Sequence, residues 1–143
     1  MKALIDTNVI VDVLQDREPW CAAGREVFLA VASRVIDGFI TAKQAADIHY
    51  FSRKQFKGQD HVDTKARDVL AKLLTLFEVT DSLAEDCREA LSLPNGDYED
   101  ALLIVNAQRA GMDCIVTRNP EHFAPCRIRV LSPEQLMAEL RAG

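Results

Sequence analysis

The feature of this sequence that most constrains its fold is the regular alternation of short apolar runs with longer amphipathic stretches. Apolar runs of strand length occur at residues 3–5, 38–41, 76–79, 114–117 and 128–131. Helices are predicted between them at residues 9–14, 19–35, 42–56, 62–74, 81–91 and 97–110, with one more from Ser132 onward. Strands separated by helices favour a parallel sheet covered on both faces. We therefore predict an α/β fold, a three-layer αβα sandwich with a central parallel sheet of about five strands.

Local signals set several of these boundaries. Pro19 suits the first turn of a helix, and Asp81-Ser82 offers an N-cap for the helix that follows. The segment Pro94-Asn95-Gly96 predicts a turn. Gly111 directly follows the helix predicted at residues 97–110 and is expected to end it. Ser132-Pro133 supplies both a cap and a first-turn proline for the last helix.

Length and composition predict one globular domain covering residues 1–143. The chain has 143 residues, of which 48% are hydrophobic and 27% charged, so it can bury a full core. No apolar run approaches the roughly 20 residues of a membrane span, and Asp6 interrupts any signal-peptide segment. We expect a cytoplasmic protein without a membrane partner. The four cysteines, Cys21, Cys87, Cys114 and Cys126, lack zinc-site spacing and are expected to be free thiols.

The net charge of −5 argues against a protein that coats nucleic acid through bulk positive charge. It leaves room for local phosphate contacts, because residues 53–72 hold six basic and three acidic residues. A solvated helix face and a phosphate-contacting face are both open interpretations of that segment. The residues that we single out as candidate RNA contacts are Arg53, Lys54, Lys57 and Arg118.

Acidic and amide side chains from distant parts of the chain are predicted to meet at one edge of the sheet. Asp6 ends the first strand, Asp47 lies on the helix after the second, and Asn119 follows the fourth. Asp97 and Asp100 begin the helix before the fourth strand; at a spacing of three they share a face. Open parallel sheets form their sites at the carboxyl ends of strands, so a site is expected here.

Several carboxylates in one place need a counter-charge. Two of them about 4 Å apart repel by roughly 4 kcal/mol at an effective dielectric constant near 20. Hard oxygen ligands without Cys or His suit Mg²⁺ or Mn²⁺, ions that can activate water for phosphodiester hydrolysis. Asp6 and Asp100 are the strongest candidates, whereas Asp97 could equally be a plain helix cap.

Three segments resemble the PIN-domain family. The opening Leu4-Ile5-Asp6-Thr7-Asn8 is similar to the family's first motif. Asp100-Ala101-Leu102-Leu103-Ile104 resembles its second, and Ile115-Val116-Thr117-Arg118-Asn119 with Phe123 resembles its third. Their order and spacing agree over essentially the whole chain. The single-domain form is similar to VapC-type toxins of toxin–antitoxin pairs and to related stand-alone PIN proteins.

The resemblance implies a parallel αβα sandwich, a divalent metal ion and endoribonuclease activity on RNA. It assigns metal-binding and catalytic roles to Asp6, Asp47, Asp97 and Asp100, and supporting roles to Thr7, Asn8, Thr117 and Asn119. It also implies a homodimer and an antitoxin protein as partners.

Two positions depart from the family pattern. Asp47 stands where a Glu is usual, so its carboxylate lies about 1 Å or more further back and could reach a metal ion only through water. Asn119 stands where many members have a fourth acid. A PIN module that binds RNA or a protein partner without cutting it is therefore the alternative hypothesis. A phosphatase of the haloacid dehalogenase type and a receiver domain are disfavoured, because their acid and lysine patterns are missing.

The remaining polar and aromatic candidates have simpler interpretations. Asp12 is a weaker candidate and Asp16 is expected to be solvated. His49 and His122 are expected to be ordinary surface or core histidines, because metal-bound water needs no histidine base. The aromatic residues expected in the core or on a dimer surface are Trp20, Phe28 and Phe39.

Overall fold

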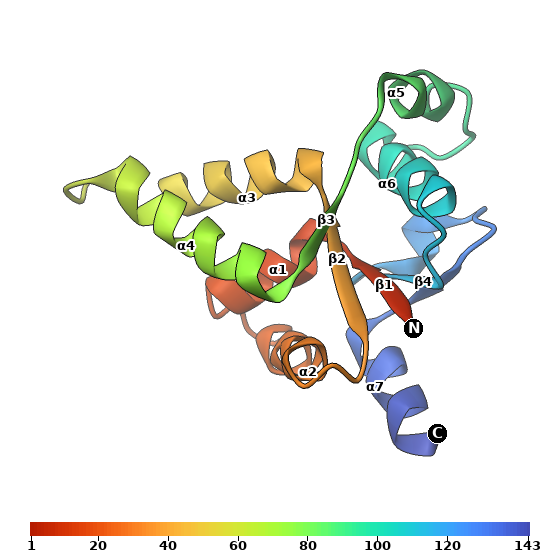
Figure 1. Ribbon diagram of the computed structural model, residues 1–143, viewed down its shortest axis with the longest axis horizontal. Helices are drawn as coiled ribbons and strands as arrows, with labels where there is room; N and C mark the ends of the chain where they lie inside the picture. The colour runs from red at the N-terminus through yellow and green to blue at the C-terminus, as the bar shows by residue number, and fades with distance from the viewer.

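The computed structural model describes residues 1–143 and has at its centre a parallel sheet of five strands in the order β3-β2-β1-β4-β5 (Figure 1). The strands are β1 (Lys2–Ile5), β2 (Asp37–Thr41), β3 (Glu78–Thr80), β4 (Cys114–Val116) and β5 (Arg129–Leu131). Every strand pairs in parallel with its neighbour. The predicted α/β class and five-stranded parallel sheet are confirmed.

Seven α-helices and one short 3₁₀ helix connect the strands. They are α1 (Thr7–Leu14), α2 (Cys21–Ala32), α3 (Ala42–Gln55), α4 (Val62–Leu76), α5 (Ala84–Ala90), α6 (Tyr98–Arg109), η1 (Pro120–Phe123) and α7 (Pro133–Ala142). In Figure 1, α3 and α4 run side by side away from the sheet, α5 and α6 lie together on the opposite side, and α7 ends the chain.

The sheet has a packed layer on each face because successive side chains of β1 point to opposite sides. Ala3 and Ile5 join a core of sixteen buried residues contributed also by α1, α2, α3, α4 and α7. Leu4, between them, joins a separate core with Leu103 and Ile104 of α6. The result is the predicted three-layer sandwich, with α6 alone supplying most of the second helical layer.

Four predicted boundaries are wrong. The helix predicted to end at residue 74 continues to Leu76, so β3 begins at Glu78 rather than at residue 76. Phe77 is 2% exposed and packs edge-to-face on Phe28 at 5.1 Å between ring centroids, because its apolar ring belongs to the core rather than to a strand. Helix α2 begins at Cys21 and ends at Ala32, shorter than the predicted 19–35.

The start of α5 also differs from the prediction. Neither Asp81 nor Ser82 caps this helix; it begins at Ala84, and the carboxylate of Asp86 accepts the Leu83 N–H at 2.8 Å. Ser82 accepts a hydrogen bond from the Asn106 side chain instead, at 3.2 Å. The predicted cap residue is thus used to tie the loop to α6.

The structure also bears on the predictions for the cysteines, for a membrane span and for the aromatic residues. All four cysteines are free thiols, as expected. None of the helices combines the length and the apolar character needed to cross a bilayer. Trp20 is 39% exposed at the start of α2, whereas Phe28 and Phe39 are partly buried against the two cores.

The strand register brings distant polar residues to one edge. Ile5 at the end of β1 pairs with Val116 at the end of β4, so Asp6 and Thr117 emerge side by side. The chain builds the sheet outward from β1 through β2 to β3, and then crosses to β4 on the other side of β1. Such a switch in strand order opens a crevice at the carboxyl ends of the strands.

Candidate active site

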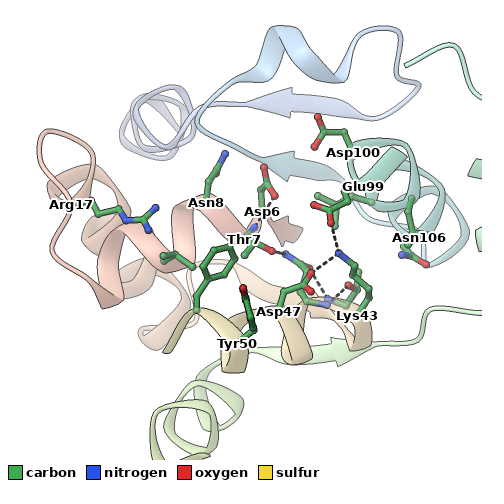
Figure 2. Close-up of a pocket in the computed structure, with 16 residues that line it drawn as sticks. Asp6, Thr7, Asn8, Arg17, Lys43, Asp47, Tyr50, Glu99, Asp100 and Asn106 are labelled. Atoms are coloured by element: carbon green, nitrogen blue, oxygen red, sulfur yellow. Dashed lines mark hydrogen bonds and ion pairs between the residues drawn. The ribbon is translucent and has the colours of Figure 1, made fainter. Parts of the chain in front are cut away.

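A cleft of about 410 Å³ lies at that edge, between α1, α3 and α6 (Figure 2). Five of the predicted site residues line it: Asp6, Thr7, Asn8, Asp47 and Asp100. The cleft therefore gathers side chains from three helices and two strand ends that are distant in the sequence.

Asp6 is held in one orientation by two donors. Its Oδ1 accepts the backbone N–H of Thr7 at 2.7 Å, which makes it the N-cap of α1, and its Oδ2 accepts the hydroxyl of Thr117 at 2.7 Å. Burial raises the pKa of Asp6, although these two hydrogen bonds act in the opposite direction. No Lys, Arg or His lies within ion-pairing distance of this carboxylate: its charge is oriented but not neutralised.

Thr117 and Asn8 support that arrangement from the β4 side. The Asn8 amide donates to the Thr117 hydroxyl at 3.5 Å, and its oxygen accepts the Arg118 N–H at 3.4 Å. Asn8 thus fixes the loop after β4 rather than contacting a carboxylate. The Thr117 hydroxyl is left free to donate its one proton to Asp6.

Asp97 and Asp100 begin α6, as predicted, but in different roles. Asp97 is exposed and its carboxylate accepts the Asp100 N–H at 3.2 Å, which makes it the N-cap. Asp100 is half-buried, and no side chain donates a hydrogen bond to it or pairs with it. Burial, with the negative charges of Asp6 and Asp97, raises the pKa of Asp100 to about 6. The Asp100 carboxyl therefore lies close enough to Asp6 to be affected by its negative charge.

Asp47 faces the same cleft but has a basic partner. Its Oδ2 accepts a hydrogen bond from Lys43 Nζ at 2.6 Å, and the same Nζ lies 3.1 Å from Glu99 Oε1 on α6. Figure 2 shows Lys43 between these two acids, across the cleft from Asp6. Asp47 is therefore already compensated, unlike Asp6 and Asp100.

Asn119 and Arg118 lie at a neighbouring cavity on the other side of α1. There the Arg118 guanidinium is 3.0 Å from Oδ2 of Asp12 and stacks 4.0 Å from the Trp20 ring centroid. Asn119 lines this cavity rather than the cleft, and its backbone N–H donates to Thr117 at 3.3 Å. Both residues therefore line this cavity rather than the cleft, although the charge of Arg118 still lowers the pKa of Asp6.

The weaker acids and the histidines stay outside the cleft. Asp12 is 1% exposed and serves the ion pair with Arg118, whereas Asp16 is exposed and paired with Arg25. His49 Nε2 lies 3.1 Å from Asp63, and the side chain of His122 is 63% exposed.

Comparison with known proteins identifies the family. The sequence model described as PIN domain matches residues 2–121. This chain belongs to the PIN-domain family. A search of curated protein sequences finds no match.

Solved structures share the PIN fold at low sequence identity. FitAcB from Neisseria gonorrhoeae is similar with a TM-score of 0.70 and 16% identity, covering 92% of this chain and 98% of that one. DNA-bound VapBC from Salmonella typhimurium gives a TM-score of 0.64 and 21% identity, over 93% and 98% of the two chains. A sarcin–ricin loop-cleaving VapC toxin from Mycobacterium tuberculosis gives 0.58 and 11%, over 79% and 86%. At these identities the likeness establishes the fold.

PIN nucleases generally use divalent metal ions, and the donor set of this PIN domain can be tested for that role. No three Asp, Glu, His or Cys side chains lie close enough together to form a preformed metal cluster. Asp6 and Asp100 nevertheless supply hard oxygen ligands, and their negative charges repel each other. Mg²⁺ is often held by one or two carboxylates while it keeps several waters. The two carboxylates fit an ion of that kind.

The cleft also contains residues that the sequence did not single out. Gln44 is buried and donates to the Ile5 carbonyl at 2.8 Å and the Thr7 hydroxyl at 3.2 Å, tying α3 to the end of β1. Thr41 and Gln44 form a capping box, a pattern that the spacing T-x-x-Q could have revealed. Lys43 and Glu99 gave no such signal, because their contact depends on how α3 and α6 face each other.

Proposed function

We propose that this PIN domain is a metal-dependent endoribonuclease that hydrolyses RNA phosphodiester bonds. The observation that carries the proposal is the pair of carboxylates, Asp6 and Asp100, which face one cleft with no basic partner in a chain of the PIN family. Two nearby carboxylates repel each other, so each raises the free energy needed to ionise the other. A bound cation relieves this repulsion.

Each residue of the cleft has a distinct task in this proposal. Asp6 and Asp100 would hold Mg²⁺ or Mn²⁺, with Asp97 adding negative charge beside Asp100. When bound, such an ion supplies an acidified water and stabilises charge on the phosphate. The Thr117 hydroxyl fixes the orientation of Asp6, and Asn8 fixes Thr117. Asp47, paired with Lys43, would act on the ion only from a distance.

A basic groove beside the cleft supports RNA as the substrate. Tyr50, a residue that is 58% exposed, lines both the cleft and a second groove with Arg53, Lys54 and Lys57. Lys54 Nζ lies 5.5 Å from the Tyr50 ring centroid, so a cation and an aromatic face are presented together. Of the other basic residues of the segment, Arg67 is ion-paired with Asp63.

The biological setting is part of the same proposal. Structures similar to this one are those of VapBC and FitAcB, so we propose a toxin whose cognate antitoxin is a separate chain. A homodimer and a cytoplasmic location, where RNA is available, complete the proposal. Sedimentation of the purified chain, alone and with a candidate antitoxin, tests the two assemblies.

The test of catalysis is a Mn²⁺ titration with two readouts in the same preparations. Wild type should gain thermal stability with Mn²⁺, because the ion binds only the folded state, and should cleave a mixed-sequence RNA. Asp6→Asn and Asp100→Asn should lose both responses. Asp16→Asn is the matched control, because it removes the same charge from an exposed residue that is paired with Arg25 and lies outside the cleft. Identical cleavage by wild type and Asp6→Asn would refute the proposal.

A binding module without catalysis is the second candidate. Two observations favour it: Lys43 neutralises Asp47, and Asn119 lies at the neighbouring cavity instead of the cleft. This candidate predicts that wild type binds RNA and Mn²⁺ but leaves every RNA intact. Turnover that disappears in Asp100→Asn would exclude it.

A further inference from the structure

Lys43 differs from an ordinary surface lysine because its ammonium group contacts two acids in the cleft. It lies in the first turn of α3, and its Nζ contacts Asp47 Oδ2 at 2.6 Å and Glu99 Oε1 at 3.1 Å. The two acids come from α3 and α6, on opposite walls of the cleft (Figure 2). The Lys43 side chain is 35% exposed, so water screens its charge only partly.

The cleft therefore divides into two halves of different charge. In one half Asp47 and Glu99 share the ammonium group of Lys43. In the other half Asp6 and Asp100 have no basic partner within ion-pairing distance. Both halves line the same cavity of about 410 Å³.

We propose that Lys43 is a fixed cation of this site. Its ammonium group fills the space between Asp47 and Glu99 that a second metal ion would otherwise take, and it binds an RNA phosphate. The inference rests on the proposed nuclease function. An ammonium group has three N–H donors, and two are directed at Asp47 and Glu99. The third is available for a phosphate oxygen lying between Lys43 and the Asp6–Asp100 pair.

Charge repulsion explains why one metal ion is expected. A divalent ion beside Asp47 would lie next to the Lys43 ammonium, and the two positive charges would repel in a partly enclosed cleft. Asp47 lies four residues after Lys43 on the same helix face, so its carboxylate reaches the ammonium group. The ion pair thus takes the one carboxylate of α3 away from metal binding.

The competing explanation is a salt bridge that only fastens α3 to α6. A bridge of that kind would change thermal stability when broken but not the number of metal ions bound. Lys43→Met removes the charge and keeps most of the aliphatic stem, and Lys43→Arg keeps the charge. The pair of variants separates the charge of Lys43 from its packing.

The experiment counts bound Mn²⁺ by electron paramagnetic resonance and measures RNA affinity in EDTA by fluorescence anisotropy. Wild type and Lys43→Arg should bind one Mn²⁺ per chain, and Lys43→Met should bind a second, weaker one. RNA affinity in EDTA should fall about threefold to tenfold in Lys43→Met, as expected for the loss of one solvent-accessible hydrogen bond. Lys43→Gln replaces Lys43→Met if the latter does not fold.

The outcomes distinguish the two proposals. Absence of any Mn²⁺ binding by wild type would overturn the nuclease function and this inference with it. One Mn²⁺ in both wild type and Lys43→Met, with unchanged RNA affinity, would overturn only the role of Lys43. A second Mn²⁺ in wild type would also overturn that role while leaving the nuclease function intact.

Discussion

The hydroxyl of Thr117 donates a 2.7 Å hydrogen bond to the carboxylate of Asp6, a residue 111 positions earlier in the chain. The contact exists because β1 and β4 are neighbours in register, with Ile5 opposite Val116. It fixes the rotamer of the carboxylate that we propose as a metal ligand, and it lowers the pKa of Asp6 against the effect of burial.

Removing this donor should weaken metal binding without unfolding the protein. Thr117→Val keeps the shape of the side chain and leaves Asp6 Oδ2 without its partner. We expect Mn²⁺ affinity to fall about tenfold or more, as for other residues that orient metal ligands. Thr117→Ser retains the hydroxyl and should bind Mn²⁺ like wild type. Equal affinity in the valine and serine variants would show that the hydrogen bond does not matter for the ion.

The pKa of Asp100 predicts an inverted pH dependence of stability in the metal-free protein. A pKa raised to about 6 means that the folded state binds this proton more tightly than the unfolded chain does. The contribution of Asp100 to stability is therefore largest below its ordinary value near 3.8 and is lost as pH rises to about 6. Asp100→Asn should raise the melting temperature at pH 7 in EDTA and flatten its dependence on pH between those two values.

Metal should reverse this behaviour in wild type. Because protons and Mn²⁺ compete for Asp100, the stabilisation by Mn²⁺ should shrink as pH falls below about 6. Asp100→Asn should show no such stabilisation at any pH. Thermal melts with and without Mn²⁺ across this range test both statements, and a wild-type response independent of pH would contradict them.

The architecture and the meeting of Asp6 with Thr117 follow from sequence patterns because strand ends in a parallel sheet share an edge. Partners across helices do not follow in the same way. That Lys43 reaches Glu99 depends on the mutual orientation of α3 and α6, which hydrophobic periodicity does not specify.

Predictions made from local sequence were also wrong where a tertiary contact uses the same polar side chain. Ser82 is a good cap residue, but the buried Asn106 side chain uses its hydroxyl instead. Arg118 looked available for RNA in the sequence, and the structure pairs it with Asp12, a buried acid whose charge needs a partner. Side-chain destinations of this kind become visible only once the elements are placed.

Breaking the ion pair of Asp12 with Arg118 should strongly destabilise the fold, even though burial raises the pKa of Asp12 against the opposing effect of the Arg118 charge. Asp12 is 1% exposed, so Asp12→Asn would leave the guanidinium of a partly buried Arg118 without its counter-charge. We expect a loss of about 3 kcal/mol in the free energy of unfolding. Asp16→Asn is the control, because the exposed Asp16–Arg25 pair should contribute less than about 1 kcal/mol. Urea unfolding of both variants measures the difference, and equal losses would contradict it.

Gly38 should tolerate no side chain, because the second strand passes close to two packed residues. A Cβ there would lie 2.7 Å from a Val31 methyl carbon and 2.8 Å from the Phe77 ring. Gly38→Ala should therefore destabilise the fold by about 1–3 kcal/mol through overpacking. Gly96→Ala is the matched control, since a Cβ at Gly96 meets nothing within 4 Å. Urea midpoints that fall only in Gly38→Ala would support the packing of β2 against α2 and Phe77, whereas a neutral Gly38→Ala would mean that this contact can relax without cost.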